Sequence, residues 1–277
     1  MIVVLRLAVR AALRPHRILP KIRLWVEAAR IGLRYDQAKY ELEQADAFRA
    51  VGLDYEESKR TLDGVYTENP KLLDPFASCH HNVFAALSKA RDFQTILEIG
   101  THSGKASLLL SKLFPRATID TIDLPDDHPV SRGSYARQDE DTRAAFTKNR
   151  DATLQESTNI SFTPIDSITL VLAREQRYDF IWIDGDHDSP MVVMDITNSL
   201  RLLNPGGVIA CDDVFTKSPG RSDTFNSMAS IETIHHLQGA GLVDCGLVFK
   251  RTKKPYAHPL RRKFIALLWL ADSKRNT

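Results

Sequence analysis

Acidic residues gather in two short stretches of this 277-residue sequence, WIDGDHD at 182–188 and ACDDV at 210–214. In each stretch the acids follow a short apolar run that is typical of a buried strand. If the two runs are neighbouring parallel strands, their ends lie about 4.8 Å apart and Asp184, Asp212 and Asp213 converge. Three carboxylates without cysteine suit a hard ion such as Mg²⁺ or Mn²⁺. The alternatives are a shared proton, a buried arginine, or acids that only cap the next segment.

Two residues beside the first of these acids could remove a proton from a bound hydroxyl group. The unperturbed pKa of a histidine lies near neutrality, which favours His187 as a general base. Asp186 is the competing base, and it could instead orient the His187 ring. From the residues alone this choice stays open.

A third stretch, LEIGTHSG at 97–104, has the composition of a turn that approaches a ligand. Gly100 and Gly104 carry no Cβ that would keep the backbone away from it. Their spacing is not the G-x-G-x-x-G of dinucleotide-binding folds, and Lys105 is not followed by the Ser or Thr of a phosphate-binding P-loop. Glu98 is unsuited to a phosphate and suits a cationic ligand.

Further acids follow the next two apolar runs. Asp123 ends the second run, where a carboxylate can accept both hydroxyl groups of a ribose. Asp166 and Ser167 come directly after the third run and could border an adenine. With the glycine turn, these residues predict a nucleoside site.

The elements that position these residues alternate between short apolar runs and helical stretches, which predicts a parallel sheet with helices on both faces. Residues 20–62 and 73–91 are expected to be helical. The expected strands are Thr95–Ile99, Thr118–Leu124, Ile160–Pro164, Phe180–Asp184 and Gly207–Cys211, followed by a helix at Ile231–Gly239 and an edge strand ending near Phe249.

The segment 125–150 is long and polar for a connection between a strand and a helix. Loops of this length are usually functional. We expect it to begin as a lid-like loop and to end as a helix. The residues expected to cover the acceptor are His128, Arg132, Tyr135 and Arg137.

The net charge of +2 is distributed unevenly. Residues 1–35 carry a net charge of +7 and residues 250–277 a net charge of +8, whereas residues 36–249 carry −13. An acidic body disfavours non-specific binding of nucleic acid. The basic ends also contain apolar residues, so they predict amphipathic helices on an anionic membrane surface, or packing against the body or a second subunit.

Length and composition indicate a globular protein with one α/β domain and an extension, or with two small domains. The sequence contains 43% hydrophobic and 26% charged residues and lacks an apolar run of about 18 residues that could cross a membrane. Its cysteines, Cys79, Cys211 and Cys245, fit neither a disulfide framework nor a zinc site, which predicts a cytoplasmic location.

The acid and glycine pattern of 97–104, with Asp123 after it, resembles the class I S-adenosylmethionine-dependent methyltransferases over residues 90–215. His102 stands at the middle glycine of the family motif, as in O-methyltransferases resembling caffeoyl-CoA methyltransferase. The acids at 184–213 resemble those of metal-dependent O-methyltransferases of the catechol and macrocin types. In the macrocin type, the acid at the position of Asp186 is thought to be the base.

This resemblance implies a Rossmann-like, doubly wound, mainly parallel seven-stranded sheet with an N-terminal helical extension. It implies Mg²⁺ or Mn²⁺ at Asp184, Asp212 and Asp213, and Asp186 or His187 as the catalytic base. It also implies S-adenosylmethionine as cofactor, bound by Glu98, Gly100, Thr101, His102, Gly104, Asp123, Asp166, Ser167 and Asp184.

The expected activity is methyl transfer to a hydroxyl of a small-molecule or glycan-like acceptor. The alternative is a non-catalytic adenosine-ligand-binding or assembly protein that keeps the fold. The expected divisions are a helical extension at 1–72, a methyltransferase domain at 73–255 and a basic amphipathic tail at 256–277. Contact of the basic ends with the inner face of the membrane, and homodimer formation through the first helices, are further expectations.

Overall fold

The computed structural model describes residues 15–74, 76, 78–133, 137–173, 175–217, 227–254 and 256–271. Their strands form one seven-stranded sheet in the order β3-β2-β1-β4-β5-β7-β6. The strands are β1 Thr95–Ile99, β2 Thr118–Asp123, β3 Ile160–Pro164, β4 Tyr178–Ile183, β5 Leu203–Phe215, β6 Val243–Phe249 and β7 Lys263–Leu270. All neighbours are parallel except β7, which is antiparallel to both β5 and β6. The predicted fold class is therefore confirmed.

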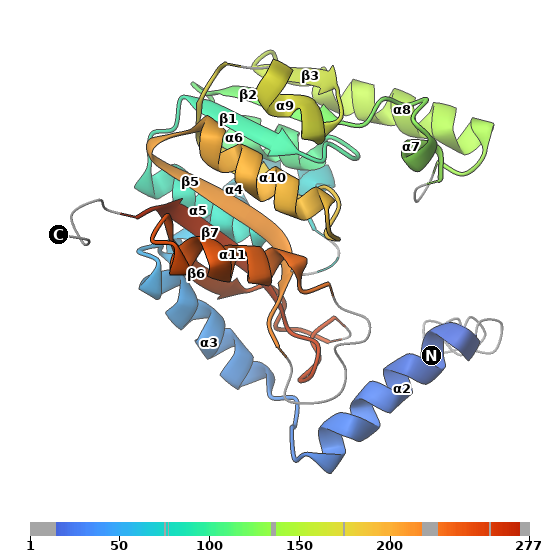
Figure 1. Cartoon of the computed structure of the whole chain (residues 1–277), viewed down its shortest axis with the longest axis vertical. Helices are drawn as coiled ribbons and strands as arrows, with labels where there is room; N and C mark the ends of the chain where they lie inside the picture. Colours follow the sequence, from blue (N-terminus) through green and yellow to red (C-terminus); the bar gives the residue numbers. More distant parts are fainter. Residues whose placement is uncertain are drawn as a thin grey trace.

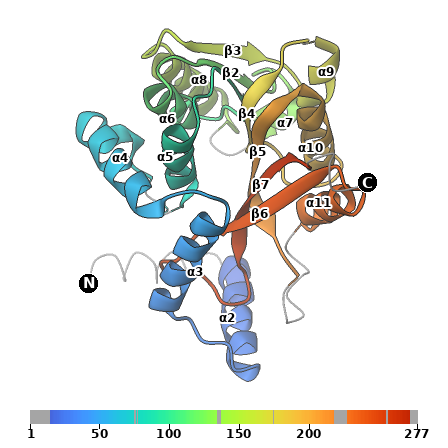
Figure 2. The same cartoon turned by 90° about the vertical axis from the view of Figure 1, so that its left-hand side faces the viewer.

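Helices cover both faces of the sheet (Figures 1 and 2). In Figure 2, α4, α5 and α6 lie on one side of the strands and α9, α10 and α11 on the other. The helices are α2 Pro15–Arg30, α3 Gln37–Ala50, α4 Tyr55–Glu68, α5 His80–Ala90, α6 Lys105–Leu113, α7 Pro129–Gly133, α8 Glu140–Leu154, α9 Leu170–Ala173, α10 Met191–Leu202 and α11 Ala229–Gly239. The helix expected from residue 73 begins only at His80, because Asp74 instead accepts the backbone N–H groups of Phe76 and Ser78 in a turn.

Strand β4 shows why the sheet is buried on both faces. Phe180 and Trp182 pack in the hydrophobic cluster beside α5 and α6, whereas Ile181 and Ile183 pack in the cluster beside α10. All four side chains are fully buried. A continuous apolar run of this kind is typical of a parallel strand covered by helices on both sides.

The expectation of an amphipathic tail is wrong for Lys263–Leu270, which forms β7 between β5 and β6. Ile265 and Leu267 enter one hydrophobic cluster, and Ala266 and Leu268 enter the other. The side chains of this segment therefore alternate between two hydrophobic clusters, and its backbone pairs with both neighbouring strands. A helix on a membrane surface would bury less of the segment. Residues 272–277 lie outside the described part of the chain.

At the other end, α2 projects from the body, as Figure 1 shows. Residues 1–14 precede the described part of the chain. Among the helices of the described ranges, none combines the length and apolar character needed to cross a membrane. The division at residue 72 remains a prediction.

Candidate active site

The register of the central strands aligns the predicted site residues in one row. Ile99 of β1 pairs with Ile122 of β2 and Ile183 of β4, and Ile183 pairs with Cys211 of β5. One residue further along these strands come Asp123, Gly100, Asp184 and Asp212. The row spans the point between β1 and β4 where the strand order reverses, which is the usual ligand-binding edge of such sheets.

Gly100 must be a glycine because two backbones meet there. Its φ is +104°, and a Cβ at this position would lie 2.3 Å from the carbonyl oxygen of Asp184. The Asp184 N–H donates to the Ile99 carbonyl at 2.8 Å, so this approach is held by a hydrogen bond. Gly104, with φ +74°, comes directly before α6, and a Cβ there would lie 2.8 Å from the Leu154 side chain.

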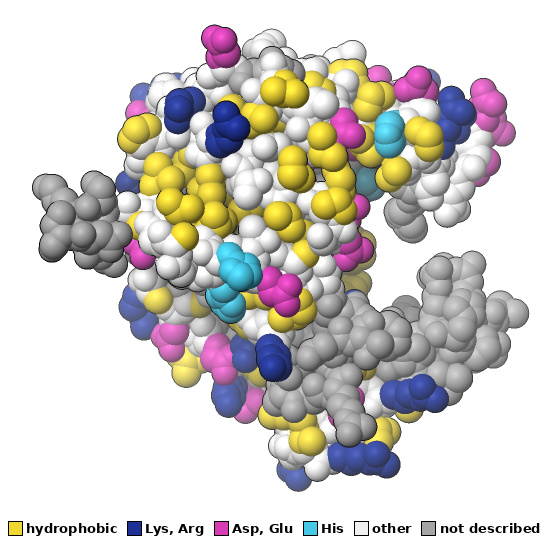
Figure 3. Space-filling model, viewed as in Figure 1, with side chains coloured by type: hydrophobic (Ala, Val, Ile, Leu, Met, Phe, Trp, Pro, Cys, Tyr) yellow, Lys and Arg dark blue, Asp and Glu magenta, His cyan; other side chains and the backbone are white. Residues whose placement is uncertain are grey.

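A cavity of about 410 Å³ opens at this row. The molecule is hollowed beside α7 and α8, with acidic side chains along the rim (Figure 3). Its apolar lining consists of Ile99, Ile122, Leu124, Val130, Ile165 and Met191, and its charged and polar side chains are His102, Asp123, His128, Ser131, Arg137, Asp166, Ser167, Asp184, Asp186 and Asp195. A cavity of this composition suits a ligand with a flat apolar part and several hydrogen-bonding groups.

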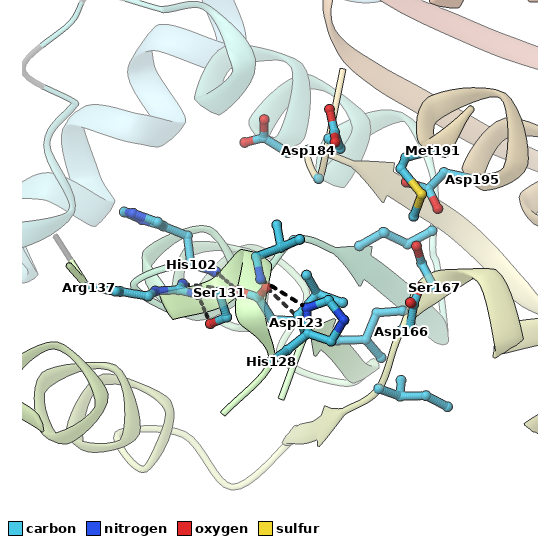
Figure 4. Close-up of a pocket in the computed structure, with 18 residues that line it drawn as sticks. His102, Asp123, His128, Ser131, Arg137, Asp166, Ser167, Asp184, Met191 and Asp195 are labelled. Carbon is cyan, nitrogen blue, oxygen red and sulfur yellow. Dashed lines mark hydrogen bonds and ion pairs between the residues drawn. The ribbon is translucent and has the colours of Figure 1, made fainter. Parts of the chain in front are cut away.

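On one side of the cavity the Asp123 carboxylate already accepts several donors (Figure 4). The His102 N–H donates to Oδ2 at 3.0 Å and the Leu124 N–H to Oδ1 at 2.9 Å. Arg137 donates to Oδ2 at 3.3 Å and to the Ser131 hydroxyl at 2.9 Å. The Arg137 contact is the longest, so a ribose hydroxyl would compete with it first.

Arg137 therefore contacts Asp123, whereas the sequence analysis predicted that it would cover the acceptor. His128 also lines the cavity, and Arg132 is exposed on α7. Tyr135 lies outside the described residues. The segment does end as a helix, α8, as predicted.

Three of the predicted cofactor residues stand behind the cavity wall. Glu98, 1% exposed, accepts hydrogen bonds from the Ser107 and Thr121 hydroxyls, and Thr121 also pairs with Thr101 at 2.7 Å. Burial raises the pKa of Glu98 to about 7, although both hydroxyls lower it. Glu98 and Thr101, like Gly104, shape the glycine turn and do not line the cavity.

Asp166 and Ser167 line the cavity next to Asp123, and Met191 and Asp195 lie beyond Ser167 (Figure 4). Asp166 Oδ1 accepts the Ile168 N–H at 3.0 Å and caps a short turn. Asp195 of α10 is 1% exposed, its Oδ1 has no hydrogen-bond partner, and burial raises its pKa to about 6.

Asp195 is absent from the sequence-based predictions. The sequence feature that could have identified Asp195 is its position on the inward face of an apolar helix, between Val192 and Ile196.

The three acids predicted as metal ligands do gather at one place. His187 Nε2 lies 3.6 Å from Asp184 Oδ1 and 4.0 Å from Asp213 Oδ2. The pKa of Asp184 is raised, first because the surrounding residues reduce its contact with water and then because Asp212 lies beside it. Its side chain is nevertheless 38% exposed. Asp186 lines the cavity, and its Oδ1 accepts the Asp188 N–H at 2.9 Å.

Two lysines, however, occupy the carboxylates of Asp212 and Asp213. Lys250 Nζ donates to Asp212 Oδ2 and, at 2.6 Å, to Asp213 Oδ1, and Lys263 Nζ donates to Asp213 Oδ2. Burial raises the pKa of Asp213, but the two ammonium groups outweigh it and hold that pKa well below its usual range. Conversely, burial alone would lower the pKa of Lys250, yet the acids raise it.

The arrangement does not fit a divalent metal ion. Mg²⁺ needs free oxygen atoms at about 2.0–2.1 Å in an octahedral arrangement. Here three of the four oxygens of Asp212 and Asp213 are held by ammonium groups. Within the described ranges no group of three or more acids, histidines or cysteines is arranged to bind a metal. Neither lysine was identified from the sequence, because nothing local to 250 or 263 indicates which acids they meet.

Comparison with known proteins indicates the type of domain that carries this cavity. Residues 97–214 match the family model of a methyltransferase domain. No curated protein matches the sequence.

Among solved structures, the S-adenosylhomocysteine-bound methyltransferase PaMTH1 of Podospora anserina is similar, with 15% identity and a TM-score of 0.51 over 87% of this chain and 98% of that one. The O-methyltransferase TomG of Streptomyces achromogenes, solved with S-adenosylmethionine, has 16% identity and a TM-score of 0.46 over 90% and 98%. The family match over residues 97–214, the strand order of the sheet and the cavity at its edge agree with a methyltransferase domain that uses S-adenosylmethionine.

Proposed function

We propose that this protein transfers the methyl group of S-adenosylmethionine to a hydroxyl group of a small or glycan-like acceptor. The observation that carries the proposal is the shared cavity. Asp123 and Asp166 line the half suited to a nucleoside, and Asp184 and Asp186 line the half next to His187. A donor bound in this cavity would therefore lie next to a side chain that can accept a proton.

The reaction is an in-line displacement, so sulfur, methyl carbon and acceptor oxygen must be collinear. Much of the rate acceleration comes from holding both substrates in that line. We propose His187 as the base that takes the hydroxyl proton. Carboxylates on two sides, Asp184 and Asp213, would stabilise the imidazolium that forms. Asp186, which faces the donor cavity, is the alternative base.

Kinetics of two variants separate these bases. With a methylated acceptor identified, His187→Ala is expected to lower kcat by about 10²–10⁴-fold, the usual contribution of a general base. Asp186→Asn should mainly change KM for the donor. A large loss of kcat in Asp186→Asn alone would assign the base to Asp186.

Calorimetry with S-adenosylmethionine and S-adenosylhomocysteine tests the donor site. Asp123→Ala removes the carboxylate at the end of β2, and hydrogen bonds to charged groups contribute about 1.5–3 kcal/mol, so Kd should rise by roughly 10–100-fold. Asp127→Ala is the matched control, because Asp127 is exposed four residues further on. No binding heat in the wild type would remove the basis of the proposal.

A non-catalytic adenosine-ligand binder with this fold is the competing function. Such a protein would bind the donor but would form no S-adenosylhomocysteine with any hydroxyl acceptor. A panel of phenols, vicinal diols and sugars, assayed for that product, distinguishes the two.

A further inference from the structure

The acidic cluster of Asp184, Asp212 and Asp213 contains a cation supplied by the chain itself. Lys250 is at the end of β6, and its side chain is 4% exposed. Its ammonium group bonds to one oxygen of Asp212 and one of Asp213. A buried ammonium group that bridges two carboxylates takes the place that a bridging metal ion would occupy.

The backbone of β5 is shaped for this bridge. Consecutive side chains of a regular strand point to opposite faces, so neighbouring aspartates would not normally share a partner. Here the pairing between β5 and β7 shifts between Cys211 and Val214, and Asp213 has a left-handed φ of +51°. A bulge of this kind redirects a side chain, and it brings both carboxylates to Lys250 Nζ.

The hairpin of β6 and β7 delivers both cations together. The Lys250 N–H donates to the Lys263 carbonyl at 2.9 Å, so the two lysines are directly paired across the hairpin. The Lys250 carbonyl in turn accepts the Cys79 N–H at 3.0 Å, just before α5. The position of Lys250 is therefore fixed by backbone hydrogen bonds on both sides.

We propose that Lys250 is the resident cation of this cluster, in place of a divalent metal ion, and that it positions Asp212 and Asp213 beside His187. A metal ion could enter only by displacing a buried ammonium group from both of its carboxylate partners. Removal of that group should therefore create a divalent-ion site that the wild-type protein lacks. The catalytic meaning of this inference rests on the proposed function, but metal binding can be measured without it.

Electron paramagnetic resonance with Mn²⁺ alone tests the inference. Wild-type protein, freed of metal with a chelator, should leave the signal of free Mn²⁺ unchanged. Lys250→Ala should bind one Mn²⁺ per chain, and Lys250→Ala with Asp212→Asn should bind none. Lys250→Arg keeps a cation in the cluster and should behave like the wild type. Lys89→Ala, at an exposed position on α5, is the control for removal of any lysine.

Two results would overturn the proposal. One is stoichiometric Mn²⁺ binding by the wild type that disappears in Asp212→Asn. The other is a Lys250→Ala protein that is folded by circular dichroism and still binds no Mn²⁺. If Lys250→Ala does not fold, Lys250→Gln replaces it, and the wild-type measurement decides on its own whether a metal ion is resident. Donor binding by calorimetry stays the separate test of the proposed function.

Discussion

Replacement of Gly100 by alanine should destabilise the protein strongly. The new Cβ would lie 2.3 Å from the Asp184 carbonyl oxygen, which is far inside van der Waals contact, and the clash is with backbone. The φ of +104° adds roughly 1–2 kcal/mol of strain for a residue with a Cβ. Forced overpacking typically costs about 1–3 kcal/mol. The free energy of unfolding should therefore fall by about 2–5 kcal/mol.

Urea unfolding followed by far-ultraviolet circular dichroism measures this change, with the slope of the transition checked for two-state behaviour. Gly64→Ala is the matched control. Gly64 lies inside α4, and a Cβ added there would have no atom within 4 Å, so alanine should stabilise by about 0.5–1 kcal/mol through helix propensity. A Gly100→Ala protein within about 0.5 kcal/mol of the wild type would refute the close approach of β1 and β4.

Two further perturbations test other parts of the structure. Because the pKa of Glu98 rises from 4.5 to about 7 on folding, the native state keeps this proton longer than the unfolded state, and stability is lost as pH rises through that window. Glu98→Gln should therefore gain up to about 3 kcal/mol of unfolding free energy relative to the wild type between pH 4.5 and 8; a difference that is independent of pH would contradict this. On α2, exposed Ile22, Trp25 and Val26 lie beside exposed Arg23 and Arg30, and Figure 3 shows hydrophobic and basic side chains together over this helix. Deletion of residues 1–34 should abolish flotation with anionic vesicles, whereas equal flotation of both proteins would rule out this contact.

Local patterns were sufficient to predict most of the sheet. The apolar runs at 95–99, 118–123 and 160–164 were identified almost to the residue, because parallel strands buried on both faces need continuous apolar sequence. The same patterns predicted that Asp184, Asp212 and Asp213 would converge, since the ends of adjacent parallel strands lie side by side. These are consequences of strand geometry and need no knowledge of distant partners.

The failures concern residues whose role depends on a distant partner. The apolar run at 264–269 is short and flanked by basic residues, which is typical of a surface helix. It forms a strand because its backbone pairs with both β5 and β6, which the local sequence does not indicate. Lys250 and Lys263 looked like ordinary basic residues of a charged tail, since their partners are 37 to 50 residues away. Three converging acids made a metal ion the natural prediction. The positive charge that balances them comes instead from two lysines of the same chain.

The place of β7 in the sheet also constrains the order in which the protein can fold during translation. β7 is the last of the seven strands to leave the ribosome, yet it is an interior strand, and β6, synthesised before it, pairs with no other strand of the sheet. Until β7 emerges, Asp213 of β5 lacks its Lys263 partner, and the backbone of β5 stays open along the edge that β7 will fill. The sheet can close only after residue 270 has been released, so its most C-terminal strand completes the fold and the sheet does not grow outward strand by strand.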